Sequence, residues 1–337
     1  MTTTEGAVIL GCAGTALLPE EAAFFRAADP WGFILFARNV ETPAQLRRLT
    51  GDLRASVGRN APVFTDQEGG RVQRLRAPRW REWTPPLDFV TAAGDRAERA
   101  LWLRYRLIAH ELRGVGIDGN CSPCLDVARA ETHPFLRNRC LAEDPATVAR
   151  LGRAVAEGHL QGGVLPVVKH MPGHGRGVSD SHQDLPSTDA DLATLIATDF
   201  APFAALADLP LAMTGHVVFR ALDDLPATQS AATLAHIRQA MGFDGLLMTD
   251  DLSMQALSGT LAERAARSVA AGCDMALYCK AEMPDAEAVV AAVGRMTPAA
   301  QARADRALAA RRAPEPVDIA ALEAELRGLG RGDVHGG

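Results

Sequence analysis

The sequence of 337 residues contains no run of about 18 apolar residues, the length that a membrane-spanning helix requires. Its first residues, Met1-Thr-Thr-Thr-Glu5, carry neither the basic nor the apolar segment of an export signal. These absences predict a cytoplasmic protein with no membrane partner. The chain also lacks a basic stripe, and its net charge is −6, which argues against nucleic acid as a partner.

Lysine is nearly absent, because only Lys169 and Lys280 occur among 35 basic residues and the others are arginine. A lysine in so arginine-rich a chain marks a position that requires a compact ammonium group, with chance composition as the alternative explanation. Six cysteines are present, and Cys121-Ser-Pro-Cys124 has the spacing of a zinc or redox pair. No second pair completes a zinc site, so we expect thiols near a strand end in a reducing cytoplasm.

Eight short apolar runs alternate with longer segments of helical pattern. The runs are 7–10, 32–37, 62–65, 117–122, 165–169, 211–214, 245–249 and 275–279. The helical segments are 19–28, 43–56, 95–113, 145–161, 189–206, 230–240, 260–271 and 283–295. Eight strand-then-helix units predict an α/β fold, a (β/α)8 TIM barrel in one domain.

An open doubly wound sheet is the alternative to the barrel. It would need a glycine fingerprint for phosphate after the first strand, and Gly11-Cys-Ala-Gly14 does not supply one. We therefore assign residues 1–297 to the barrel. Residues 298–337 are rich in alanine, arginine and glutamate, and they predict a helical extension packed on the barrel.

Polar residues gather where four of the runs end. Asp66 follows the third run, Lys169-His170 ends the fifth, His216 follows the sixth and Asp250-Asp251 follows the seventh. One polar strand end alone is often a turn cap. Because active sites of TIM barrels lie at the carboxyl ends of the strands, four such ends indicate a site there. Consecutive strand residues point to opposite faces, so only one of Asp250 and Asp251 is expected to face a substrate.

The segment Lys169 to His182 holds three of the nine histidines together with several glycines. It suits a lid that carries a proton donor, a metal site or a loop of structural importance only. The possible metal ligands are His170, His174, Asp180 and His182. Lys169 beside His170, and the lack of an HxH or HExxH pattern, argue against a metal. His182 suits proton transfer near neutral pH, Asp180 could orient its ring, and Asp250 could stabilise positive charge on a substrate.

These residues resemble a known family. Lys169-His-Met-Pro-Gly-His-Gly175 followed by Asp180-Ser-His182 is similar to the KHFPGHG…DSH signature of bacterial β-N-acetylglucosaminidases (β-hexosaminidases) of glycoside hydrolase family 3. Four other segments match the family in order: 32–39, 66–74, 122–127 and 249–254. The resemblance covers about residues 5 to 295, nearly the whole predicted barrel.

The resemblance implies roles for particular residues. Asp250 would be the nucleophile that forms a covalent glycosyl-enzyme, and His182 would be the acid/base, paired with Asp180. The sugar would be bound by these residues: Asp66, Arg74, Arg139, Lys169 and His170. Arg139 stands in Arg-Cys-Leu where the family usually has Arg-Ser-Phe, and Met171 replaces the usual phenylalanine. From its place on the rim, His216 is added as a further substrate contact.

The single-domain members that the chain resembles recycle cell-wall fragments. The resemblance therefore implies a monomeric, retaining exo-β-N-acetylglucosaminidase that uses no cofactor or metal. It would release N-acetylglucosamine from muropeptides that end in 1,6-anhydro-N-acetylmuramic acid. The alternatives are a phosphorylase that uses phosphate as acceptor, a metal-dependent hydrolase and a sugar-binding protein without activity.

Overall fold

The structure is a computed structural model that describes residues 4–177 and 185–329. All eight predicted apolar runs contain strands, and these pair in parallel in the order β7-β6-β3-β2-β1-β13-β12-β10-β8. The strands are β1 (Gly6–Gly11), β2 (Pro30–Leu35), β3 (Val63–Thr65), β6 (Gly119–Asn120), β7 (Leu165–Pro166), β8 (Val168–Met171), β10 (Leu211–Thr214), β12 (Leu246–Asp251) and β13 (Met275–Tyr278).

The fifth predicted run forms two strands, β7 and β8, at opposite ends of this order. β7 pairs with β6 and β8 pairs with β10. Between them, the N–H of Val167 lies 3.0 Å from the carbonyl oxygen of Asn120 and 3.1 Å from that of Ser122. Because one continuous run reaches both ends of the sheet, the sheet is a nearly closed barrel, and the predicted fold class is confirmed.

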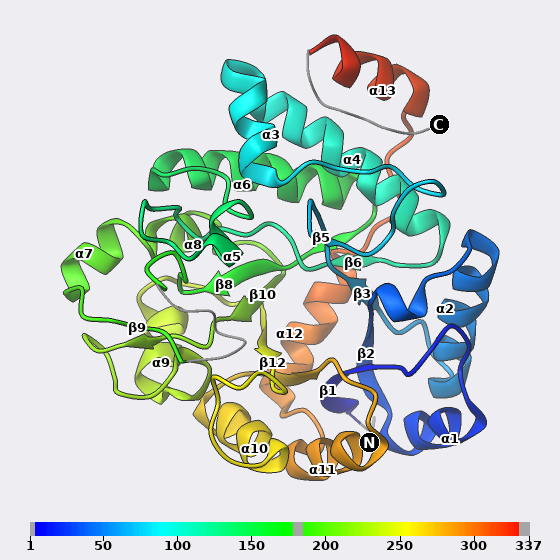
Figure 1. The fold of residues 1–337 in the computed structure, drawn as a ribbon. Coiled ribbons are helices and arrows are strands. Elements are labelled where there is room, and N and C mark those ends of the chain that lie inside the picture. Colours follow the sequence, from blue (N-terminus) through cyan, green and yellow to red (C-terminus); the bar gives the residue numbers. More distant parts are fainter. Residues whose placement is uncertain (1–3, 178–184, 330–337) are drawn as a thin grey trace.

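Helices surround the barrel, as Figure 1 shows. They are α1 (Pro19–Ala28), α2 (Pro43–Val57), α4 (Ala97–Gly114), α6 (Pro145–Gln161), α7 (Leu192–Ala197), α8 (Ala201–Ala205), α9 (Ala231–Gln239), α10 (Leu261–Ala271) and α11 (Met283–Val293). The Thr42 hydroxyl caps α2 and the Asp144 carboxylate caps α6, each followed by proline in the first turn. These start signals explain why both helices begin where the sequence predicts.

One predicted helix is wrong, because residues 189–206 form α7 and α8 with a break between them. In the break, the buried Asp199 carboxylate lies 3.2 Å from Arg129 Nη2 and 2.7 Å from Arg176 Nε. The remaining short elements are α3 (Pro86–Ala93), α5 (Pro134–Arg137), the β4 (Gln67–Gly69) and β5 (Val72–Gln73) hairpin, and the β9 (Ser187–Thr188) and β11 (Val218–Phe219) pair.

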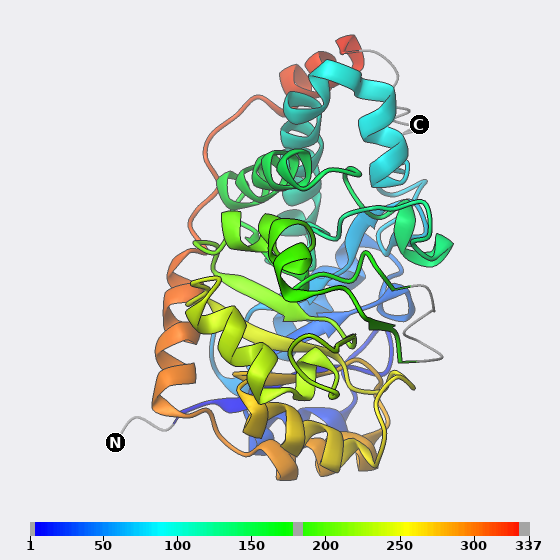
Figure 2. The same cartoon turned by 90° about the vertical axis from the view of Figure 1, so that its left-hand side faces the viewer.

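Two helices follow the barrel strands. From α12 (Pro298–Ala309), the side chains of Ala300, Ala304 and Ala307 pack into the same apolar cluster as residues of the barrel strands, such as Ile9. Figure 1 shows α12 behind the strands, and Figure 2 shows it, in orange, along one side of the barrel. The last helix, α13 (Ile319–Gly328), packs on α4. The domain boundary at residue 297 stays a prediction.

Within the described ranges, the chain has no helix with both the length and the apolar character to cross a bilayer.

Candidate active site

A cavity of about 290 Å³ lies at the carboxyl ends of the barrel strands. Its lining combines apolar side chains such as Phe36 and Met254 with many charged or polar ones. The polar lining residues are Asp66, Arg71, Arg74, Arg139, Lys169, His170, His174, Asp250, Asp251 and Cys279. The structure therefore brings the described polar strand ends, with the exception of His216, into one cavity.

Three of the predicted sugar-binding residues contact one another. Lys169 Nζ donates to Asp66 Oδ1 at 2.9 Å, and Arg74 Nη2 donates to Asp66 Oδ2 at 2.9 Å. Burial is the largest influence on the pKa of Asp66 and opposes ionisation, but Lys169 and Arg74 outweigh it and lower that pKa. The three groups stay charged, so they present donors and acceptors side by side, as vicinal sugar hydroxyls require.

Glu68, which the sequence reasoning missed, lies behind this group and is only 1% exposed. It accepts hydrogen bonds from Arg139 Nε at 3.0 Å and Nη2 at 2.8 Å, and its Oε1 is 2.6 Å from Lys169 Nζ. Burial opposes ionisation, but Arg139 and Lys169 hold the pKa of Glu68 at about 2. The sequence signal that could have identified Glu68 was its position two residues after Asp66. Glu68 fixes the two cations that face the cavity.

Asp126 was also missed, and it orients His170. Asp126 Oδ2 is 2.7 Å from His170 Nδ1, and Oδ1 accepts the backbone N–H groups of His170 at 3.3 Å and His174 at 2.6 Å. This pairing places the proton on Nδ1 and leaves Nε2, 3.4 Å from Arg139 Nη2, for the cavity side. The sequence signal for Asp126 was an acidic residue in segment 122–127, just after the fourth predicted strand.

Asp250 lies near the end of β12 and lines the cavity. Among the described residues, its carboxylate accepts one hydrogen bond, from the Asp251 N–H to Oδ1 at 2.7 Å. Burial is the largest influence and opposes ionisation, but His170, His216, the Asp251 N–H and Lys169 together lower the pKa of Asp250. An ionised carboxylate with an oxygen left for a ligand can act as a nucleophile.

The expectation that only one of Asp250 and Asp251 faces the cavity is wrong, since both line it. The strand register shifts between Met248 and Asp251, which breaks simple alternation. The Asp251 carboxylate is occupied, however, by the Ser253 hydroxyl at 2.5 Å and by the N–H groups of Ser253 and Cys279. Asp251 therefore shapes the loop, whereas the Asp250 carboxylate accepts only the Asp251 N–H among the described residues.

His216 does not stand among the lining residues, in contrast to its prediction as a substrate contact. Its ring is fully buried, with Nδ1 2.8 Å from the Thr228 hydroxyl and Nε2 3.1 Å from the Asp251 carbonyl oxygen. Because protein groups occupy both nitrogens, we no longer expect His216 to contact the sugar. It supports the backbone that carries Asp250 and Asp251.

His174 lines the cavity and is buried, and no described residue forms a hydrogen bond with either of its ring nitrogens. Its ring meets that of His170 edge to face, with centroids 5.8 Å apart. A Cβ on Gly177 would lie 2.7 Å from His174 Nδ1, so glycine is needed there. Burial holds the pKa of His174 at about 4, below its ordinary 6.5. An unpartnered, neutral ring in the cavity wall suits contact with substrate or water.

Replacing His174 with phenylalanine is expected to raise the free energy of unfolding at pH 7.5 by about 1 kcal/mol, because two unsatisfied buried nitrogens are removed. The gain should widen as pH falls from 6.5 toward 4, where the wild type loses stability because His174 binds a proton only when unfolded. Urea unfolding at pH 7.5 and 4.5 measures both effects. The exposed His110→Phe is the control, and an equal pH dependence in wild type and His174→Phe would contradict the assignment.

Asp180 and His182, the predicted proton carrier, lie outside the described residues. The structure thus places seven of the nine predicted site residues. Six of them line the cavity: Asp66, Arg74, Arg139, Lys169, His170 and Asp250.

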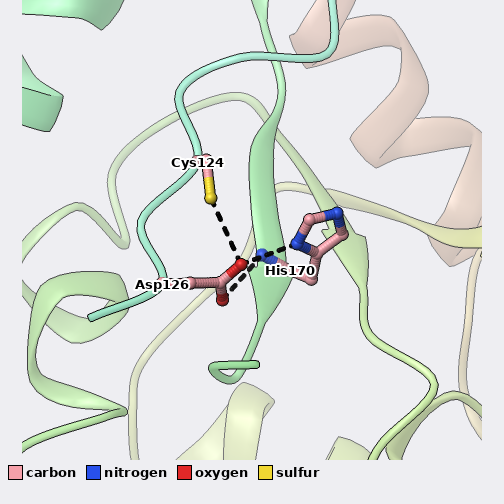
Figure 3. Close-up of side chains that lie close together, drawn as sticks. All are labelled: Cys124, Asp126 and His170. Atoms are coloured by element: carbon pink, nitrogen blue, oxygen red, sulfur yellow. Dashed lines mark hydrogen bonds and ion pairs between the residues drawn. The ribbon is translucent and has the colours of Figure 1, made fainter. Parts of the chain in front are cut away.

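Of the four metal ligands proposed in the 169–182 segment, Asp180 and His182 lie outside the described residues. Of the other two, the His174 ring has no hydrogen-bond partner in the described part of the chain, and His170 Nδ1 binds Asp126. In the described part of the chain, one group of three side chains could hold an ion, namely Cys124, Asp126 and His170 (Figure 3).

Comparison with known proteins places these features in context. Residues 23–310 match the model of the "Glycosyl hydrolase family 3 N terminal domain". A "Beta-hexosaminidase" of Bordetella avium is 35% identical over 332 residues, covering 96% of this chain and 93% of that protein. A "Beta-hexosaminidase" of Methylobacillus flagellatus is 37% identical over 287 residues, covering 82% and 81%.

Solved structures of similar proteins indicate the same family as the sequence relatives. NagZ from Neisseria gonorrhoeae superimposes with a TM-score of 0.86 at 30% identity, covering 97% of this chain and 98% of that one. The same protein has been solved in complex with N-trifluoroacetyl-D-glucosamine. The similarity spans nearly the full length of both chains.

Proposed function

This chain belongs to glycosyl hydrolase family 3 and is a β-hexosaminidase, and from that premise we propose that it is a retaining exo-β-N-acetylglucosaminidase. We further propose that its substrates are cytoplasmic muropeptides in which N-acetylglucosamine is linked to 1,6-anhydro-N-acetylmuramic acid. The mechanism rests on the position of the Asp250 carboxylate, which lines the same cavity as the Asp66, Arg74 and Lys169 group. Its neighbours lower the pKa of Asp250, which favours the ionised form.

The sugar would be held first. Asp66 accepts hydrogen bonds from sugar hydroxyls, and Arg74 and Lys169 donate to them, while Glu68 keeps Lys169 and Arg139 in place. His170 offers Nε2 on the cavity side because Asp126 binds Nδ1. These rigid contacts would orient the anomeric carbon toward Asp250. A relative of known structure was solved with an N-acylated glucosamine, which supports this class of sugar.

Cleavage would follow in two displacements. An oxygen of Asp250 attacks the anomeric carbon, the bond to the aglycone oxygen breaks, and His182 gives that oxygen a proton. A covalent glycosyl-aspartate is then present. Water next attacks the same carbon while His182 takes a proton from it, and the bond to Asp250 breaks. Two inversions give net retention, so the released N-acetylglucosamine has the β configuration.

The direct test follows the reaction of N-acetylglucosaminyl-1,6-anhydro-N-acetylmuramic acid by proton NMR in phosphate buffer. We expect β-N-acetylglucosamine to appear first and the α form to grow in by mutarotation. Initial α product would contradict the double displacement. N-acetylglucosaminyl phosphate would show that phosphate replaces water as acceptor, and no turnover of this disaccharide would contradict the proposed substrate.

His182→Ala tests the acid separately. For substrates with poor leaving groups, kcat/KM is expected to fall by about 10² to 10⁴, because the departing oxygen no longer receives a proton. For a 2,4-dinitrophenyl glycoside the first step needs no acid, so its loss should be much smaller. Rates for an aryl series of graded leaving groups, with exposed His110→Ala as control, measure the difference. Equal losses across the series would contradict the role of His182.

A further inference from the structure

Three side chains with metal-binding atoms meet behind the cavity wall. Cys124 Sγ is 3.2 Å from Asp126 Oδ2, and that oxygen is 2.7 Å from His170 Nδ1. Figure 3 shows Cys124 and Asp126 reaching from one loop toward His170 on the neighbouring strand. In the described part of the chain this is the one group of three whose ligand atoms all lie within 4.8 Å. Sulfur, oxygen and nitrogen therefore converge on one small volume.

The main chain already holds these three ligands together. Cys124 forms a parallel bridge with Lys169, and the Leu125 N–H donates to the Lys169 carbonyl oxygen at 2.7 Å. A tetrahedral zinc ion, with bonds of about 2.0 Å to nitrogen or oxygen and 2.3 Å to sulfur, separates its ligand atoms by about 3.3 to 3.6 Å. The distances of 3.2 Å from Sγ to Oδ2 and 2.7 Å from Oδ2 to Nδ1 are shorter than this, so Asp126 must move away from both neighbours to admit the ion.

A second sulfur stands next to the group. Cys140 is fully buried and packs with Cys124 in one small cluster of buried residues. Thiolate ligands favour zinc or copper(I) over magnesium and calcium. Only His170 of the three ligands lines the cavity, so an ion would enter from the cavity side.

We propose that Cys124, Asp126 and His170 form a site for a thiophilic divalent cation such as Zn²⁺, with Cys140 or water as fourth ligand, and that the bound ion inhibits the enzyme. On binding, Cys124 loses its thiol proton to solvent and the proton on His170 Nδ1 is replaced by the ion. The two negative ligands then balance the charge of the ion.

Inhibition follows from what the ion does to the cavity wall. Once Nδ1 binds the ion, the neutral His170 ring carries its proton on Nε2, which then faces the Arg139 Nη2 donor at 3.4 Å. Two donors cannot share that contact, so Arg139 or His170 must move. Both residues line the cavity, and sugar binding should weaken. This consequence rests on the proposed role of these residues in sugar binding, whereas ion binding itself does not.

The test titrates the full-length enzyme with ZnCl₂ during turnover of 4-nitrophenyl N-acetyl-β-glucosaminide. Cys124→Ser keeps a donor for Asp126 but removes the thiolate, so it should retain activity and raise the half-inhibitory zinc concentration about tenfold or more. Cys279→Ser, which alters another thiol of the cavity wall, should leave that concentration unchanged. Equal inhibition of wild type and Cys124→Ser would place the ion elsewhere and overturn the proposal.

A second measurement needs no turnover. Co²⁺ added to the wild-type enzyme should give a thiolate-to-cobalt absorption band that zinc displaces and that Cys124→Ser lacks. Absence of the band in the wild type overturns the site even if Cys124→Ser fails to fold. A band without inhibition would keep the ion site but contradict the role of His170 in sugar binding. Failure of the ion site can therefore be told apart from failure of the proposed sugar-binding role of His170.

Discussion

Asp250→Asn is expected to lower kcat for 4-nitrophenyl N-acetyl-β-glucosaminide by about 10⁴-fold or more, the scale seen when a nucleophile is removed from an enzyme. The amide oxygen can still accept the Asp251 N–H at the position of Oδ1, so the fold should be kept. What is lost is the negative charge that attacks the anomeric carbon. Steady-state kinetics measure the loss, and an unchanged melting temperature shows that it is chemical.

Asp251→Asn is the matched control for this variant. Its carboxylate is already bound by Ser253 and by the Cys279 N–H, so the substitution should disturb the loop and cost far less activity. A 5-fluoro glycosyl trap should label Asp250 in the wild-type enzyme, and azide should restore turnover to Asp250→Ala by forming a glycosyl azide. A label on Asp251 or Glu68 would contradict the assignment.

Lys169→Met is expected to reduce the free energy of unfolding by about 3 to 5 kcal/mol, because it leaves the buried Glu68 and the partly buried Asp66 without their shared cation. Lys169 is 2% exposed and lies 2.9 Å from Asp66 and 2.6 Å from Glu68. Burial works against the charge on Lys169, but the two carboxylates raise its pKa, which shows how strongly they hold it. Sugar binding should fail as well, so kcat/KM should collapse.

The same variant should also change how stability depends on pH in acid. With a pKa of about 2, below its ordinary 4.5, Glu68 stabilises the fold fully above pH 4.5 and less as pH falls toward 2. Without Lys169 that pKa rises, so acid unfolding should begin at higher pH in the variant. The exposed Lys280→Met is the control. Wild-type stability and an unchanged acid midpoint in Lys169→Met would refute the central role of this cation.

Much of the fold follows from patterns that are local in sequence. Apolar runs and capped helices such as α2 and α6 follow from residues a few positions apart, so they could be predicted. The break between α7 and α8 could not, because it depends on Asp199 meeting Arg129, which lies far away in the chain. The division of the fifth run into β7 and β8 also depends on two neighbours, β6 and β10, that only the closed barrel brings near.

The site likewise contains residues that could be predicted from the sequence and residues that could not. Asp66, Lys169, His170 and Asp250 could be predicted because strand ends of a barrel share one rim. Glu68 and Asp126 were missed because their importance comes from partners far away in the chain, Arg139 and His170. His216 is the converse case. It follows a strand end, but its ring binds the Thr228 hydroxyl and is not among the residues that line the cavity.

The paired charges of Asp66, Arg74 and Lys169 have a consequence for salt tolerance. Dissolved ions screen exposed charges within about 8 Å at physiological ionic strength, but they act weakly on buried pairs. A neutral N-acetylglucosaminide brings no charge of its own to these residues. Its KM should therefore change little as sodium chloride increases, so any salt dependence found with a peptide-bearing substrate would report contacts of the charged peptide outside the sugar pocket.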